Sequence, residues 1–349
     1  MRILITVIGC FIFFSASAQK LKHAEKYIDY ITKQQKNVMK EFFNYNKSIS
    51  YVSKKHTAKK IQGRYNELMS AINEAKSSID SLPSFKRDST HKDSIYRDSA
   101  SSYFKQFSLV LSNSYNKVAT LQATAGQSYG NMEAYLEAKE AADKKLKTLN
   151  EHFYAITLKF ANSNKAIDST RKDLASKKMG DVIETGKYFR QAYLIFFKSY
   201  KQEADVQNAI ERKDVNDLKK SAKDLAKSSE DGQSRLDTIP PFKNNKALTT
   251  DSKAVLAFYE KEAEDKLDPI EDYFSAAKDF DEVRSTFNRK SGHSGPEVKK
   301  YKKSVAIFNK ALHKYNKAMN GLYKKKKGLL KKMDNTTHSF FNKFKPTVK

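Results

Sequence analysis

The stretch that decides the fold is residues 61–86, IQGRYNELMSAINEAKSSIDSLPSFK. Its apolar residues recur at alternating spacings of four and three, at Ile61, Tyr65, Leu68, Ile72, Ala75, Ile79 and Leu82. A mean spacing of 3.5 residues keeps one apolar seam facing a partner helix, as in coiled-coil-like bundles. Pro83 cannot continue a helix, and we expect Phe85 to close the end of the bundle. The stretch therefore predicts a seam helix that ends in a Pro-x-Phe corner.

A second copy of this pattern follows in the same register. Residues 238–243, TIPPFK, repeat the corner of residues 81–86, SLPSFK, so the two corner prolines, Pro83 and Pro240, lie 157 residues apart. Five of the seven seam positions are apolar in the second copy as well, where the seam reads Leu218, Ala222, Leu225, Ser229, Gly232, Leu236 and Ile239. A heptad alone could match by accident, but a heptad together with the corner could not easily do so. We interpret the chain as an internal duplication.

Each copy contains the material for four long helices. An aromatic-rich helix precedes the seam helix, and two more helices follow the corner, the last with its own apolar seam. Glycine and proline total only 17 of 349 residues, too few for the turns of an all-β protein. We therefore predict an all-α fold of two tandem duplicated four-helix bundles with long coiled-coil-like helices, elongated in shape. The expected parts are repeat 1 at 19–166, a linker or helical joint at 167–180, repeat 2 at 181–323 and a basic amphipathic C-terminal tail at 324–349.

The first eighteen residues are typical of a cleaved signal peptide. Arg2 precedes an apolar run at residues 3–14, and Ala16-Ser17-Ala18 supplies the small residues that a signal peptidase accepts. A membrane anchor is the alternative, but the run is shorter than the roughly 20 apolar residues that span a bilayer. Lipoprotein processing at Cys10, the single cysteine, is a weaker alternative. We expect an exported protein of the periplasm or the outer surface, with a mature chain that has no disulfide.

Motifs that carry chemistry are not found in the sequence. None of the seven histidines has a glutamate three residues before it, as the di-iron bundles require. The sequence also has no glycine-rich phosphate loop and no nucleophile elbow. Carboxylates such as Glu262, Glu264 and Asp265 are interpreted as members of a solvated helix face. We therefore predict a non-enzymatic binding or scaffold protein of the cell envelope, with no catalytic residues, cofactor or metal. The alternative is an envelope enzyme or metal-dependent protein with a site between the two bundles.

The positive charge is concentrated at the C-terminus. The chain carries a net charge of +26, and residues 297–349 hold sixteen lysines against two acids. Because the next seam position after Leu322 is Lys326, and burial of an unpaired lysine is costly, we expect the bundle to end near Tyr323. The candidate residues for contact with an anionic surface are Lys324, Lys325, Lys326, Lys327, Lys331, Lys332, Phe340, Phe341 and Phe344.

Several partners fit such a tail. It could lie on an anionic membrane or lipopolysaccharide surface, with phenyl groups in the interface and ammonium groups on phosphates. The sequence leaves open an unknown protein partner and another anionic envelope polymer. Extracellular nucleic acid is a less favoured partner, with an affinity that would fall steeply in salt. The tail could also fold back over the bundle ends with its lysines solvated.

Short Asp-Ser/Thr-apolar tripeptides resemble the O-glycosylation acceptor of exported proteins from Bacteroides-type bacteria. The candidate acceptors are Ser81, Ser94, Ser99 and Thr238, and the alternative is that these residues cap helices. The signal ending, the lysine- and tyrosine-rich body and the repeated Ile/Leu-Pro-x-Phe corner also resemble uncharacterised exported all-helical proteins of these bacteria, described as surface proteins or domains of unknown function. That resemblance implies no activity and no functional residues.

Overall fold

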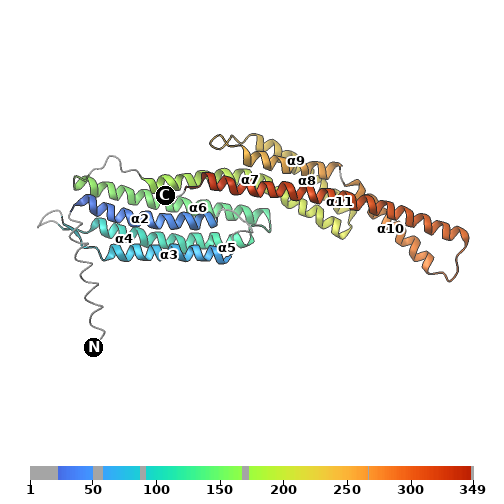
Figure 1. Cartoon of the computed structure of the whole chain (residues 1–349), viewed down its shortest axis with the longest axis horizontal. Coiled ribbons are helices and arrows are strands. Elements are labelled where there is room, and N and C mark those ends of the chain that lie inside the picture. Colours follow the sequence, from blue (N-terminus) through green and yellow to red (C-terminus); the bar gives the residue numbers. More distant parts are fainter. Residues whose placement is uncertain (1–22, 50–57, 87–91, 167–172, 266, 347–349) are drawn as a thin grey trace, which may run out of the picture. The chain divides into compact units, whose positions relative to one another are not determined.

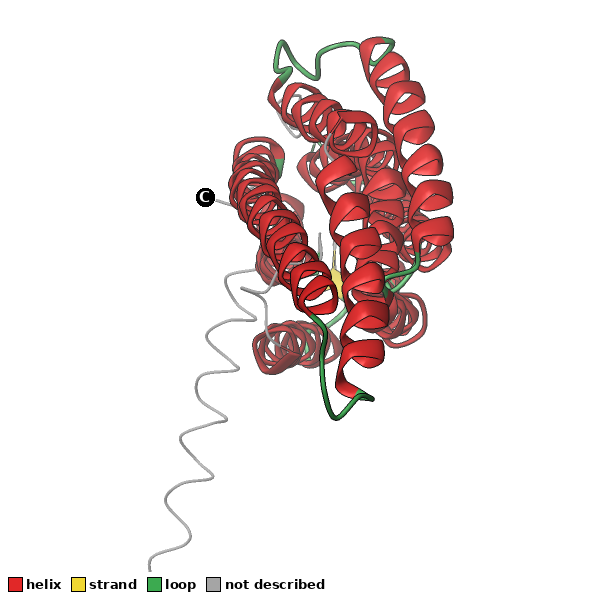
Figure 2. Ribbon diagram, turned by 90° about the vertical axis from the view of Figure 1, so that its right-hand side faces the viewer, coloured by secondary structure: helices red, strands yellow, loops and turns green. Residues whose placement is uncertain are grey.

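The computed structural model describes residues 23–49, 58–86, 92–166, 173–265 and 267–346 (Figure 1). Helix makes up 87% of the structure, which confirms the all-α class. In Figure 2 the described elements are helices apart from one short pair of strands. The expected signal peptide, with Cys10, lies outside the described residues.

The chain divides into two compact units. Unit 1 contains the described residues up to Lys187 together with those from Lys343 onward, and unit 2 runs from Tyr188 to Asn342. The division falls inside one long helix, α7 (Leu174–Arg212). The sequence placed the joint earlier, at 167–180, of which residues 167–172 lie outside the described part of the chain.

Unit 1 is built from helices that run side by side (Figure 1). They are α2 (Ala24–Ser48), α3 (Ala58–Asp80), α4 (Ile95–Val110), the π-helical turn η1 (Leu111–Tyr115), α5 (Asn116–Thr124) and α6 (Tyr129–Ser163), and the first part of α7 also belongs to this unit. Helix α3 packs against α2 and α4, while α6 packs against α2, α4 and α5. The seam residues Leu68, Ile72, Ala75 and Ile79 are buried, each at most 1% exposed. The 3.5-residue pattern therefore marks the face of α3 that packs into the core.

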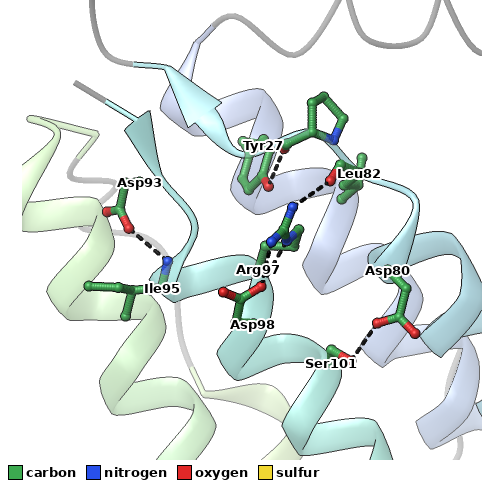
Figure 3. Close-up of polar contacts among 9 residues, drawn as sticks. Tyr27, Asp80, Leu82, Asp93, Ile95, Arg97, Asp98 and Ser101 are labelled. Carbon is green, nitrogen blue, oxygen red and sulfur yellow. Dashed lines mark hydrogen bonds and ion pairs between the residues drawn. The ribbon is translucent and has the colours of Figure 1, made fainter. Parts of the chain in front are cut away.

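Polar contacts hold the first Pro-x-Phe corner, as Figure 3 shows. The Tyr27 hydroxyl of α2 donates to the Pro83 carbonyl at 2.9 Å, and the Arg97 guanidinium of α4 donates to the Leu82 carbonyl at 3.1 Å. The Asp93 carboxylate accepts from the Ile95 amide at 2.8 Å, where α4 begins. The corner thus satisfies backbone groups that the end of α3 and the start of α4 leave open.

An aromatic cluster fills this end of unit 1. Phe85, in the two-residue strand β1 (Phe85–Lys86), is 4% exposed, and β1 pairs antiparallel with β2 (Lys92–Asp93). The Phe85 ring lies 5.4 Å from the Tyr27 ring and 5.2 Å from the Phe160 ring of α6. Such edge-on ring pairs stabilise the junction of three elements beyond the area they bury.

Unit 2 contains the second part of α7 followed by four helices. They are α8 (Val215–Asp237), α9 (Ala247–Asp265), α10 (Asp268–Asn288) and α11 (Gly295–Phe344). Helix α8 packs against α9, and Gly232 allows a close approach, because an added Cβ there would lie 2.8 Å from the Cδ1 atom of Leu256. At the second corner the Phe242 ring lies 5.0 Å from the Tyr188 ring and 5.5 Å from the Phe340 ring.

Helix α11 differs from the expectation at its centre. It continues without a break from Gly295 to Phe344, so Tyr323, near which the sequence predicted the end of the bundle, lies inside a helix. The Lys326 ammonium, which that prediction took to be unpaired, forms an ion pair with the Glu203 carboxylate of α7. A lysine with a carboxylate partner can occupy a seam position, whereas an unpaired one would be costly.

Candidate functional site

An exposed basic stripe follows one face of α11 in unit 2. Lys324, Lys327 and Lys331 are spaced by three and four residues, so they lie above one another on the helix surface, and Tyr323 lies one turn before Lys327. The Tyr323 ring is 62% exposed, and the Lys327 ammonium lies 5.8 Å from its centre. The three lysines are exposed as well. We call these four residues the basic stripe.

The other predicted lysines lie against the body of unit 2. Lys326 pairs with Glu203, and Lys332 pairs with the buried Asp251 of α9 at 2.8 Å. The Lys325 ammonium lies 5.6 Å from the centre of the Phe258 ring, a cation–π arrangement. Three of the predicted lysines therefore contact α7 or α9, although Lys325 and Lys332 remain exposed.

The predicted phenylalanines do not lie with the exposed lysines. Phe340 and Phe341 are only 3% and 4% exposed. Phe340 packs on the second corner, and the Phe341 ring lies 4.8 Å from the Phe189 ring of α7. Phe344 is half-buried. Because hydrophobic burial within the fold takes up two of these rings, they are not available for insertion into an interface.

A cleft of about 600 Å³ opens between α9 and α11 of unit 2, bordered by Pro269 of α10. Apolar groups from Phe258, Ala318 and Leu322 line it. The exposed lysines around it come from both helices and are Lys261, Lys314, Lys317 and Lys325. We call this the α9–α11 cleft.

A buried carboxyl group forms part of the cleft wall. Glu262 is 1% exposed, and its Oε2 atom has no hydrogen-bond partner among the described residues. Burial, and secondarily the nearby Glu203 carboxylate, raises the pKa of Glu262 to about 7, against the opposing effect of Lys326. Burial also raises the pKa of the neighbouring Tyr259 hydroxyl. The Glu262 carboxyl is therefore partly protonated at neutral pH.

Unit 1 has a buried polar cluster of a different kind. The Asp143 carboxylate of α6 accepts hydrogen bonds from the Tyr115 hydroxyl at 2.5 Å, the Asn46 amide at 2.9 Å and the Lys139 ammonium at 2.6 Å. The Asn46 side-chain oxygen in turn accepts from Lys345 at 3.0 Å. Burial, and secondarily Asp143, raises the pKa of Tyr115. These contacts link α2, η1 and α6 through the Asp143 carboxylate, which has hydrogen-bond partners on both oxygens.

The predicted acceptor hydroxyls fall into two environments. Ser81 and Thr238 are exposed just before the two corner prolines, and each donates to a carbonyl three residues earlier, at 3.0 Å and 2.8 Å. Ser94 is the N-cap residue of α4 without a side-chain capping bond, and Ser99 lies within α4, both half-buried.

Sequence reasoning placed Glu262 on a solvated face with Glu264 and Asp265, but only the latter two are exposed. Glu262 follows Phe258 and Tyr259 at spacings of four and three, which continues the buried stripe of α9. That spacing was the available signal. The buried Asp143 likewise follows Leu136 by seven residues and precedes Leu146 by three, within the buried face of α6.

Neither a metal cluster nor a membrane span is found among the described residues. They contain no group of three or more histidine, cysteine, aspartate and glutamate side chains that could hold a metal ion. They also contain no helix with the length and apolar character needed to cross a membrane. Comparison of the chain with protein-family models, curated proteins and solved structures found no match. The resemblance to exported helical proteins of Bacteroides-type bacteria therefore stays a prediction.

Proposed function

We propose that the chain is an exported, non-enzymatic binding or scaffold protein of the cell envelope, built from a duplicated four-helix unit, that contacts an anionic membrane surface through the basic stripe. The observation that carries the contact is the alignment of Lys324, Lys327 and Lys331 with the exposed Tyr323 on one face of α11. Lysines near an anionic leaflet each contribute about 1 kcal/mol of binding free energy. A tyrosine places its ring at the headgroup level with its hydroxyl in water.

Matching positions in the two units support the duplication. Helices α3 and α8 each have 23 residues, and both bounds of α8 lie 157 residues beyond those of α3 (58 to 215 and 80 to 237). The third helix of each half is interrupted at corresponding positions, by η1 at Leu111 in unit 1 and by the start of α10 at Asp268 in unit 2. Each corner phenylalanine packs between a tyrosine of the first helix and a phenylalanine near the end of the last.

Vesicle flotation tests the contact. At low salt, vesicles of phosphatidylglycerol and phosphatidylcholine should bind the protein, and vesicles of phosphatidylcholine alone should not. The triple variant Lys324→Ala, Lys327→Ala and Lys331→Ala should weaken the binding by on the order of a hundredfold. Salt of about 0.5 M should also weaken vesicle binding by the wild-type protein, because it screens exposed charges.

A matched control lies on α2 of unit 1. Lys33, Lys36 and Lys40 are exposed and have the same relative spacing as the three lysines of the stripe. Their replacement by alanine removes the same charge from a different place and should leave most of the vesicle binding intact. Equal losses in the two triple variants would attribute the binding to net charge and refute a specific stripe.

The duplication has its own test. In an experimentally determined structure, α2 to α6 should superpose on α7 to α11 with the two corner phenylalanines at matching positions. Two halves that cannot be superposed in this order would contradict the duplication without affecting the vesicle result.

A further inference from the structure

We propose that the α9–α11 cleft binds one small amphipathic anion, an alkyl or acyl chain that carries a phosphate or carboxylate group. This inference does not depend on the basic stripe. Residues 314, 317, 321 and 325 line the cleft and none of them belongs to the basic stripe, although Lys317 and Lys324 are seven residues apart and lie on the same side of α11. The two sites can therefore be removed one at a time.

The lining of the cleft combines the two properties that such a ligand needs. Phe258, Ala318 and Leu322 offer apolar surface, so a hydrocarbon chain placed there leaves water. The volume of about 600 Å³ lies within the range of small-molecule sites. These features favour an occupant with a substantial apolar body over a simple ion.

The positive charge around the cleft indicates the chemistry of the ligand's head group. Four lysines, Lys261, Lys314, Lys317 and Lys325, line it, and Glu262 is the one acidic residue of its lining. Charge-assisted hydrogen bonds from ammonium groups to phosphate or carboxylate oxygens are among the strong ones. The surplus of positive charge therefore selects an anionic head group.

Glu262 supplies an independent observation. A buried polar atom without a hydrogen-bond partner is costly and rare in native proteins, yet Oε2 of Glu262 is such an atom among the described residues, in the cleft wall. The Oε2 atom is itself buried from solvent, so Glu262 acts on a ligand in the cleft through the charge that the carboxyl group carries or loses, not through direct contact of this atom.

Protonation of Glu262 should control the affinity. The charged and titratable groups that act on it are Glu203 of α7 and Lys326 of α11, with Tyr259 beside it on α9. Because Glu262 has a pKa of about 7, a rise in pH through neutrality adds a negative charge to the wall of the cleft. Anion binding should therefore be tighter at pH 6 than at pH 8.

Isothermal titration calorimetry of the full chain with decyl phosphate, below its micelle-forming concentration, tests the proposal. We expect saturable binding of one molecule, with inorganic phosphate and the neutral decyl maltoside each at least tenfold weaker. Equal binding of decyl maltoside would show an apolar groove without charge selection, and equal binding of inorganic phosphate would show an ion site without an apolar component. Either result, or no binding of decyl phosphate, would overturn the proposal.

Variants locate the site. The double variant Lys314→Ala and Lys317→Ala should weaken decyl phosphate binding by at least about tenfold, since each lost charge-assisted contact contributes about 1.5–3 kcal/mol. The triple variant of the basic stripe should retain it, which separates this result from the vesicle experiment. Equal effects of the two variants would contradict the assignment.

The Glu262→Gln variant isolates the role of protonation. It keeps a hydrogen-bond donor at this position and cannot ionise. The part of the affinity loss between pH 6 and pH 8 that is due to ionisation of Glu262 should therefore disappear. Because the titration of decyl phosphate itself is common to both proteins, the difference between them reports Glu262 alone. A pH dependence identical to that of the wild-type protein would remove Glu262 from the site.

Discussion

The two units each bury a carboxylic acid, but they treat it in opposite ways. In unit 1, Asp143 is 2% exposed and accepts hydrogen bonds from a tyrosine, an asparagine and a lysine. In unit 2, Glu262 is 1% exposed, has an unpartnered oxygen among the described residues and lines a cleft. The two acids are therefore buried to a similar extent, but among the described residues only Asp143 has a full set of hydrogen-bond partners.

The difference in hydrogen bonding between the two buried acids indicates which of them stabilises the fold and which belongs to a binding site. A charge whose hydrogen bonds are all made within the fold gives rigidity, and its removal leaves its partners unsatisfied. A carboxyl group that the fold leaves unsatisfied costs free energy, and such groups are found preferentially where a ligand can compensate them. We therefore assign Asp143 to the stability of unit 1 and Glu262 to the site of unit 2.

The largest expected effect tests the first half of this comparison. Asp143→Ala leaves the buried Lys139 ammonium without a carboxylate and should reduce the free energy of unfolding by about 3–5 kcal/mol. Urea unfolding followed by circular dichroism measures the loss, and hydrogen exchange in α2 and α6 assigns it to unit 1. Glu151→Ala is the control, because this acid forms an exposed pair with Lys147 on the same helix and should cost less than about 1 kcal/mol. Similar losses would mean that the Asp143 cluster has no special role.

The second prediction concerns the pH dependence of unit 2. The folded-state pKa of Glu262, about 7, exceeds the ordinary glutamate pKa of 4.5. Between these values the folded state binds more protons than the unfolded state, so the free energy of unfolding falls as pH rises and the full penalty is present above pH 7. At about 1.4 kcal/mol for each pKa unit, the penalty is at most about 3 kcal/mol.

Glu262→Gln should remove this penalty. Its stability should match that of the wild-type protein below about pH 4.5 and exceed it by up to about 3 kcal/mol at pH 8. Urea titrations of both proteins at several pH values measure the difference, with Glu264→Gln as an exposed control on the same helix. A wild-type protein that is more stable than Glu262→Gln at pH 8 would show that Glu262 is a satisfied carboxylate after all.

Much of the fold could be predicted because it depends on local periodicity. The seam from Leu68 to Ile79 and the corner at Pro83 are properties of neighbouring residues, and each appears in the structure where the spacing places it. The environment of Lys326 could not be predicted in the same way. Its partner is Glu203, a residue of α7 that is distant in sequence.

The candidate site was predicted less well for a related reason. Outward lysines such as Lys324 and Lys327 can be recognised from charge alone, but the burial of Phe340 and Glu262 depends on tertiary packing. A single-chain pattern gives the face of a helix on which a residue lies. It does not say whether another helix covers that face.

The smallest expected effect tests the correspondence of the seams of α3 and α8. Gly232 lies 157 residues after Ala75, the offset of the proposed duplication, and a Cβ there would lie 2.8 Å from Leu256 Cδ1 and 3.3 Å from Ile195 Cγ2. Gly232→Val adds methyl groups where neighbouring side chains must already move, and should reduce the free energy of unfolding by about 2 kcal/mol. Urea unfolding followed by circular dichroism measures the loss.

The control for this substitution is Gly63→Val on α3, where a Cβ would meet no atom within 4 Å. Valine is a better helix former than glycine, so this variant should be neutral or slightly more stable. If both valines have the same effect, Gly232 does not mark a close approach of helices. If only Gly232→Val destabilises the protein, Gly232 marks a close approach of α8 to its neighbours.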